Sequence, residues 1–129
     1  MEPSLSNYSA AALAYLGDCA LEICAREYLV EKMGHASSAR LNKAAMEFVC
    51  APKQAAAVKN LLSVLTEDES AAFHLGRNMG HTSIPRSATA SEYRNATGME
   101  AIFGWLHIAG KQERMRELFR IAYGLDENE

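Results

Sequence analysis

Residues 15–22 read Tyr-Leu-Gly-Asp-Cys-Ala-Leu-Glu, an apolar stretch with helical spacing in which one ionisable group follows a glycine. Burying that group, Asp18, would be costly unless a positive charge paired with it. No Lys or Arg lies within a helical turn of Asp18, and the nearest is Arg26. A metal cation is therefore a candidate partner. The candidate second ligand is Glu100, in residues 93–104, which read Tyr-Arg-Asn-Ala-Thr-Gly-Met-Glu-Ala-Ile-Phe-Gly.

Length and composition indicate one cytoplasmic domain. The 129 residues can build a single core but are too few for two. No run approaches the roughly 20 apolar residues that a membrane span needs, and the N-terminus does not resemble a secretion signal. The three cysteines form no CxxC pair, and their odd number favours apolar positions in a reducing compartment over disulfides or zinc.

The charge distribution leaves nucleic-acid binding open. The net charge of −3 disfavours it, but residues 70–124 hold seven Lys/Arg against four Asp/Glu. A locally basic surface on an acidic protein can still bind phosphates.

The apolar residues recur with a helical period along the whole chain, and no segment alternates as a strand would, so we predict an all-α fold of about six helices. Two capping boxes, Thr66 to Glu69 and Thr89 to Glu92, mark helix starts. Glycines at 34, 110 and 124 mark helix ends. The first predicted helix covers about 9–33, the second follows a cap at Ser37 or Ser38, and the third begins at Pro52. The last three cover about 66–78, 89–109 and 111–123, and residues 79–89 are predicted to form a loop.

Two pairs of side chains could bring oxygen ligands together if their helices pack against each other. Asp18 and Glu22 share one helix face, and Thr97 and Glu100 share another. Mg²⁺ prefers carboxylate and water oxygens and keeps several waters, so two carboxylates would suffice. The ion, for which Mn²⁺ is a possible substitute, would lower the pKa of a bound water for phosphodiester hydrolysis.

Plainer interpretations stay open for each candidate. Asp18 and Glu100 could be ordinary surface residues, and Glu22 could pair with a neighbour. Gly17 and Gly104 each weaken a helix by about 1 kcal/mol relative to alanine, which indicates either a close helix crossing or ligand access.

Basic and amide side chains around the 79–89 loop are candidates for binding RNA phosphates. These are Arg77, Asn78, Arg86 and Arg94. Lys43 is a further candidate. Ordinary solvated surface charge is the alternative for all five, and the arginines of the last helix, at 114, 116 and 120, are expected on its exposed face.

Residues 15–22 resemble the signature helix of ribonuclease III catalytic domains, in which Leu-Gly-Asp carries a catalytic aspartate. Residues 97–104 resemble the second acidic segment of that family, whose glutamate binds the catalytic metal. The Gly76-Arg77-Asn78 run, the Pro85 loop and Tyr93-Arg94 are similar to the Mini-ribonuclease III branch, which lacks a double-stranded-RNA-binding domain. The resemblance covers roughly residues 7–124, with an acidic tail at 125–129.

The resemblance implies an all-helical homodimer in which each subunit supplies one site with Asp18 and Glu100 as catalytic metal ligands. The two sites would cut opposite strands of duplex RNA, and Tyr15 and Leu16 would lie at or near the dimer interface. The implied task is maturation of the ends of the 23S ribosomal RNA precursor, either as bare RNA or with ribosomal proteins bound. Arg77, Asn78, Arg86, Arg94 and Lys43 would grip the duplex.

The sequence departs from larger family members, which carry glutamates at the positions of Ala11 and Ala14 and an acid at that of Thr97. Asn42 stands where the branch usually has a His. The Mini-ribonuclease III branch shares the loss of these acids, so the departures fit the branch, although fewer ligands would weaken Mg²⁺ binding. A catalytically inactive, helical double-stranded-RNA-binding dimer is therefore the alternative function, and a helical interaction domain without RNA affinity is a third.

Overall fold

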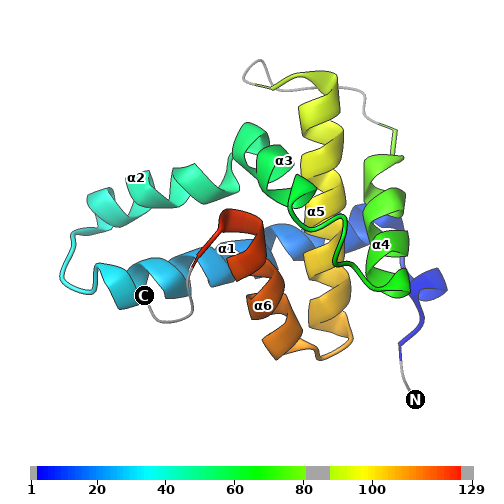
Figure 1. Ribbon diagram of the computed structural model, residues 1–129, viewed down its shortest axis with the longest axis horizontal. Coiled ribbons are helices and arrows are strands. Elements are labelled where there is room, and N and C mark those ends of the chain that lie inside the picture. The colour runs from blue at the N-terminus through cyan, green and yellow to red at the C-terminus, as the bar shows by residue number, and fades with distance from the viewer. Residues whose placement is uncertain (1–2, 81–87, 126–129) are drawn as a thin grey trace.

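The computed structural model describes residues 3–80 and 88–125, and within them the protein is all-helical (Figure 1). A short 3₁₀ helix at Leu5–Asn7 comes before the helices α1 (Ala10–Lys32), α2 (Ser38–Val49), α3 (Ala51–Lys59), α4 (Glu67–Arg77), α5 (Ala90–Ile108) and α6 (Gln112–Tyr123). No strand occurs in these residues, so the predicted fold class is confirmed. The 3₁₀ helix is an element that the apolar period did not predict.

The helix starts follow the predicted caps. Ser9 and Ser37 cap α1 and α2, and Pro lies in the first turn of α3. Both capping boxes form, since the N-cap hydroxyl accepts from the N3 backbone and the N3 glutamate accepts from the N-cap backbone in α4 and α5. Gly110 and Gly124 adopt positive φ after α5 and α6 as expected. Gly34 does not, and α1 ends at Lys32 with Met33, at negative φ, as its C-cap.

Helix α5 is the centre of the molecule. It stands upright in Figure 1, with α1 crossing it and α3, α4 and α6 packed around it. Its middle is buried on every side, from Ala96 to Met99 and from Ala101 to Leu106. Burial of this kind is typical of a core helix rather than an amphipathic surface helix. The end of α1 and the whole of α2 extend from this bundle as an arm.

Aromatic rings hold the arm against α6. Phe48 of α2 packs against Tyr28, Phe119 and Tyr123, with ring centroids 5.9, 5.6 and 5.0 Å away. The Tyr123 hydroxyl also donates to the carbonyl oxygen of Phe48. The loop after α3 is held by Asn60, whose side-chain amide donates to the carbonyl of Ala122 at 2.9 Å. These contacts join α2, α3 and α6.

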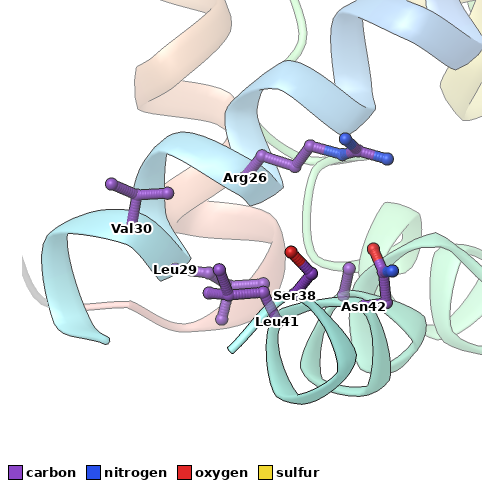
Figure 2. A pocket seen from close by; sticks show the side chains of 7 residues that line it. Arg26, Leu29, Val30, Ser38, Leu41 and Asn42 are labelled. Carbon is purple, nitrogen blue, oxygen red and sulfur yellow. The ribbon is translucent and has the colours of Figure 1, made fainter. Parts of the chain in front are cut away.

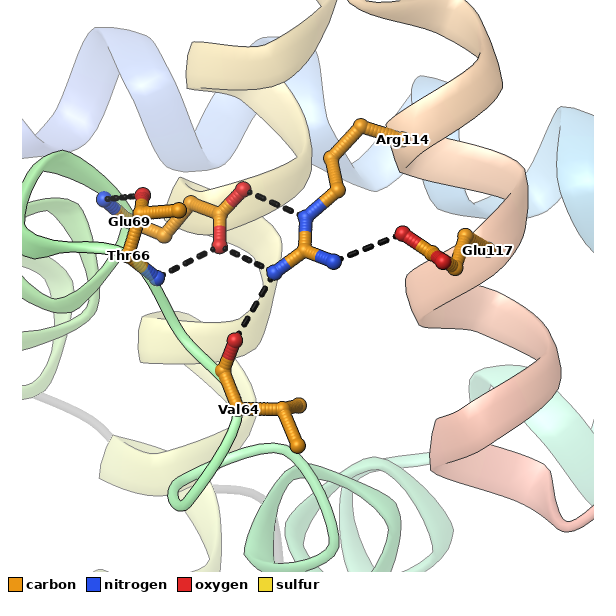
Figure 3. Close-up of polar contacts among 5 residues, drawn as sticks. All are labelled: Val64, Thr66, Glu69, Arg114 and Glu117. Atoms are coloured by element: carbon orange, nitrogen blue, oxygen red, sulfur yellow. Dashed lines mark hydrogen bonds and ion pairs between the residues drawn. The ribbon is translucent and has the colours of Figure 1, made fainter.

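A single arginine ties α6 to the start of α4 (Figure 3). Arg114 donates from Nε and Nη2 to the two carboxylate oxygens of Glu69, each at 2.9 Å, and from Nη2 to the carbonyl of Val64 at 2.8 Å. Its Nη1 donates to Glu117 at 2.6 Å. The sequence-based expectation that Arg114 lies on the exposed face of α6 is therefore wrong: the side chain is three-quarters buried and is paired with an almost fully buried carboxylate.

Candidate active site

Two glycines allow α1 and α5 to cross at backbone contact. A Cβ added to Gly17 would lie 1.5 Å from the carbonyl oxygen of Glu100, and a Cβ on Gly104 would lie 2.0 Å from the carbonyl oxygen of Leu13. No side chain fits at either position without moving a helix. Of the two interpretations open from the sequence, the structure therefore supports a close helix crossing.

This crossing brings the two candidate carboxylates together. Asp18 follows Gly17 on α1, and Glu100 is the residue whose backbone Gly17 touches. The two carboxyl groups are close enough to hydrogen bond. Burial first, and then the negative charge of Asp18 and that hydrogen bond, raise the pKa of Glu100 to about 8. At neutral pH the pair therefore tends to keep one proton, and a cation would favour the fully ionised pair.

The reason given from the sequence for a cation at Asp18 is wrong in one respect. Asp18 is exposed at the edge of the buried stripe of α1, and Glu100 is the carboxyl group that burial destabilises. Apolar residues occur on both faces of α1, so the sequence could not show which face meets the core. Proximity to Glu100, rather than the burial of Asp18, supports a metal site.

The other two oxygen-bearing candidates have different partners. Glu22 pairs with Arg26 at 3.0 Å, which agrees with the plainer interpretation of that residue. Thr97 is buried and donates its hydroxyl proton to the carbonyl of Tyr93 at 2.9 Å, so the contribution of Thr97 to a ligand cluster stays a prediction.

The donor set fits a hard cation that keeps most of its water. Residues 3–80 and 88–125 contain no group of three or more His, Cys, Asp or Glu side chains arranged to hold a metal ion. The protein therefore offers two carboxylates from the described residues, the exposed one of Asp18 and the half-buried one of Glu100. Mg²⁺ and Mn²⁺ suit oxygen ligands of this kind, and the open side of Asp18 leaves room for water and substrate.

The candidate RNA-binding residues lie on several elements. Arg77 is the last residue of α4 and donates from Nε to Oδ1 of Asn95 at 3.2 Å, while its Nη1 lies 3.5 Å from Oδ1 of Asn78. Arg94 is exposed on the first turns of α5 and Lys43 is exposed on α2. Asn95 could not be recognised as a partner of Arg77 from the sequence, because a lone Asn near a helix start carries no distinctive signal. Arg86 lies outside the described residues.

The far side of α1 carries an unusual row of exposed apolar side chains. Tyr15 is 85% exposed, and Ile23 and Val30 follow at 53% and 55%. Val30 also borders a pocket of about 180 Å³ between α1 and α2, into which Arg26, Ser38 and Asn42 point from its rim in Figure 2. Exposed apolar side chains gathered on one helix face are candidates for a surface that binds a partner.

The sequence-family model of the ribonuclease III domain matches residues 11–111 of this chain, a span that includes both Asp18 and Glu100. The chain belongs to the ribonuclease III family of endoribonucleases. Relatives place it in the Mini-ribonuclease 3 group of that family. One from Symbiobacterium thermophilum is 40% identical over 110 residues, covering 85% of this chain and 84% of the relative. One from Brevibacillus brevis is 36% identical over 128 residues, covering 99% and 93%.

A solved structure supports the same fold for this ribonuclease III domain. The crystal structure of a Fusobacterium nucleatum protein superposes with a TM-score of 0.81 at 30% identity, covering 92% of this chain and 93% of that one. In the described part of the chain, no helix is both long and apolar enough to cross a membrane.

Proposed function

We propose that this protein is a Mg²⁺-dependent endoribonuclease that cleaves double-stranded RNA, with Asp18 and Glu100 as its catalytic metal ligands and Mn²⁺ as a possible substitute ion. The observation that carries the proposal is the pairing of these two carboxyl groups across the glycine crossing of α1 and α5. Membership of the ribonuclease III family supports the reaction class.

The residues of the site divide the work. Mg²⁺, when bound, supplies a Lewis acid that acidifies a water and offsets the negative charge that develops on the phosphodiester. Glu100 would contribute its carboxylate from a backbone position fixed by the helix crossing, and Asp18 would contribute an exposed carboxylate. Burial and then the neighbouring charge of Asp18 raise the pKa of Glu100, so a cation held by the two residues would favour the deprotonated carboxylate of Glu100.

The substrate we propose is a stem of the 23S ribosomal RNA precursor, bare or with ribosomal proteins bound, in the cytoplasm. Duplex RNA is recognised mainly through phosphates and 2′-hydroxyls, which requires donors rather than a deep pocket. Arg77, Asn78, Arg94, Lys43 and Arg86 are the proposed donors. The first four are exposed side chains.

We also propose a homodimer formed through the exposed row of α1, so that two sites cut opposite strands. Tyr15, Ile23 and Val30 support this interface because each leaves a large apolar side chain in water. Leu16, half-buried beside the row, would lie at its edge.

The test is cleavage of an end-labelled ribosomal-precursor stem with Mg²⁺, with EDTA and with Asp18→Asn. We expect cuts on both strands that disappear with EDTA and fall by at least about 100-fold in the variant, because a lost ligand removes the charge that holds the ion. Full cleavage by Asp18→Asn would exclude Asp18 as a ligand.

The alternative function is an inactive double-stranded-RNA-binding dimer. It is favoured by the side chains that stand where larger relatives carry acids, since Thr97 is committed to the carbonyl of Tyr93 and cannot replace a carboxylate. Duplex binding without Mg²⁺-dependent cleavage at any enzyme excess would establish this alternative.

A further inference from the structure

Arg77 differs from other arginines of the molecule in what it binds. Arg26, Arg114 and Arg116 each pair with a carboxylate, at 3.0 Å to Glu22, 2.9 Å to Glu69 and 3.3 Å to Glu27. The partners of Arg77 are instead the amide oxygens of Asn95, at 3.2 Å, and of Asn78, at 3.5 Å.

Neutral acceptors orient a guanidinium without cancelling its charge. The closer contact uses Nε of Arg77, and Nη1 reaches Asn78 only at 3.5 Å, so the outer edge formed by the two Nη atoms keeps donors for a further acceptor. That edge has the fork geometry that binds two oxygens of a phosphate at once. A guanidinium only donates hydrogen bonds, so the contact also fixes the Asn95 amide with its oxygen toward Arg77.

The elements that carry this pair are rigid relative to the candidate active site. Gly76, next to Arg77, packs so closely on α5 that a Cβ would lie 2.7 Å from the carbonyl oxygen of Thr97. Asn95 lies on α5 five residues before Glu100, about 7.5 Å along the helix axis. One helix therefore sets the distance between the arginine and the carboxyl pair.

We propose that Asn95 is a positioning residue that holds Arg77, which makes no ion pair within residues 3–80 and 88–125, as a preorganised clamp for a backbone phosphate of the RNA duplex. This inference rests on the proposed function. A long side chain fixed before binding loses less rotamer freedom when the phosphate arrives. Asn95 thus contributes to RNA affinity without touching RNA.

The test measures duplex-RNA affinity in EDTA, so that no cleavage occurs, for Asn95→Ala, Asn95→Asp, Arg77→Ala and the double variant Asn95→Ala/Arg77→Ala. We expect Arg77→Ala to weaken RNA binding roughly 10-fold. We also expect it to reduce the slope of log affinity against log salt concentration by about 1, the value for one lost phosphate contact. Asn95→Ala should weaken binding roughly threefold through lost positioning. Asn95→Asp should weaken it more than Asn95→Ala, because its carboxylate would pair with Arg77 as Glu22 pairs with Arg26.

The double variant separates positioning from a general structural role. If Asn95 acts through Arg77, the double variant binds as Arg77→Ala does, and Asn95→Ala raises KM in the Mg²⁺ assay while leaving kcat unchanged. Lys53→Ala is the charge control, since Lys53 pairs with Glu47 at 3.3 Å and its loss should leave affinity within about twofold.

Three outcomes overturn the inference alone, and a fourth overturns the proposed function with it. If Asn95→Ala lowers RNA affinity by the same factor in the wild type and in Arg77→Ala, the role of Asn95 is structural and does not act through Arg77. Unchanged affinity in Asn95→Asp would show that Arg77 does not hold a phosphate beside Asn95. Normal RNA affinity in Arg77→Ala would contradict the clamp, while Mg²⁺-dependent cleavage by the wild type would still support the proposed function. A wild type that neither binds nor cuts duplex RNA would contradict the clamp and the proposed function together.

Discussion

At the residue scale, Gly17 decides whether the carboxyl pair can exist. A methyl group there would lie 1.5 Å from the backbone of Glu100, which no rotamer change can relieve because the obstacle is backbone. We expect Gly17→Ala to lower the free energy of unfolding by about 3 kcal/mol or more and to reduce cleavage with it, because α1 must move away from α5. Urea unfolding measures the first and the stem-cleavage assay the second.

Gly80→Ala is the matched control for Gly17→Ala. A Cβ on Gly80 meets nothing within 4 Å, and the φ of Gly80 is not positive. This substitution should change stability by less than about 1 kcal/mol. A Gly17→Ala protein as stable as Gly80→Ala would contradict the backbone contact between the two helices.

The identity of the two candidate carboxylates could be inferred from the sequence, but their surroundings could not. Gly17 and Gly104 stand out as costly residues within helices, yet their sequence positions do not reveal that the two helices touch each other. Asp18 looked buried because apolar side chains surround it in the sequence, and some of them, such as Tyr15, face water. The order of residues along a helix cannot distinguish a face covered by the core from one left exposed.

At the scale of elements, the junction of α4 and α6 gives a pH-dependent stability. Burial alone would raise the pKa of Glu69, but hydrogen bonds from Arg114 and the Thr66 backbone outweigh it and hold the pKa below its ordinary value. The stabilisation is therefore complete above the unfolded-state pKa of about 4.3 and is lost as the pH falls through the folded-state pKa.

We expect Glu69→Gln to lower the free energy of unfolding by about 2 kcal/mol at pH 7. The difference from the wild type should begin to shrink below the unfolded-state pKa of about 4.3 and should disappear as the pH falls through the lower folded-state pKa, where the wild-type carboxylate is protonated too. Urea unfolding across this range is the measurement. Glu117→Gln removes the more exposed partner of Arg114 and should cost less than about 1 kcal/mol. A Glu69→Gln deficit that stays constant with pH would contradict the charged pairing.

Helix boundaries were the part of the fold most open to sequence reasoning, because capping is local chemistry. Thr66 and Thr89 form the boxes that their spacing predicts. Arg114 shows where such reasoning stops, since its partners Glu69 and Val64 lie 45 and 50 residues away and helical periodicity carries no information about them. Contacts of this range depend on which helices pack together, which local patterns leave undetermined.

At the scale of the whole molecule, α1 contacts α5 through one face and leaves apolar side chains on another. A monomer gains nothing from exposing Tyr15, Ile23 and Val30, and burying them against a second copy would remove three large side chains from water. The proposed dimer therefore accounts for the apolar side chains on both faces of α1, which made the buried face of this helix impossible to recognise from the sequence. Cys19, exposed on the same helix, is a departure from the apolar core position expected for the cysteines.

The dimer proposal is tested by placing a charge in the row. We expect the wild type to sediment as a dimer and Tyr15→Asp to weaken the dimer by more than about 10-fold, since aromatic side chains at the centre of an interface contribute most to affinity. Tyr15 is 85% exposed in the single chain, so the helical circular dichroism should not change. Leu62→Asp is the control, because Leu62 is 49% exposed but lies outside α1, and it should leave the dimer intact. Equal dissociation by both variants, or a monomeric wild type that cuts both strands, would contradict an interface at α1.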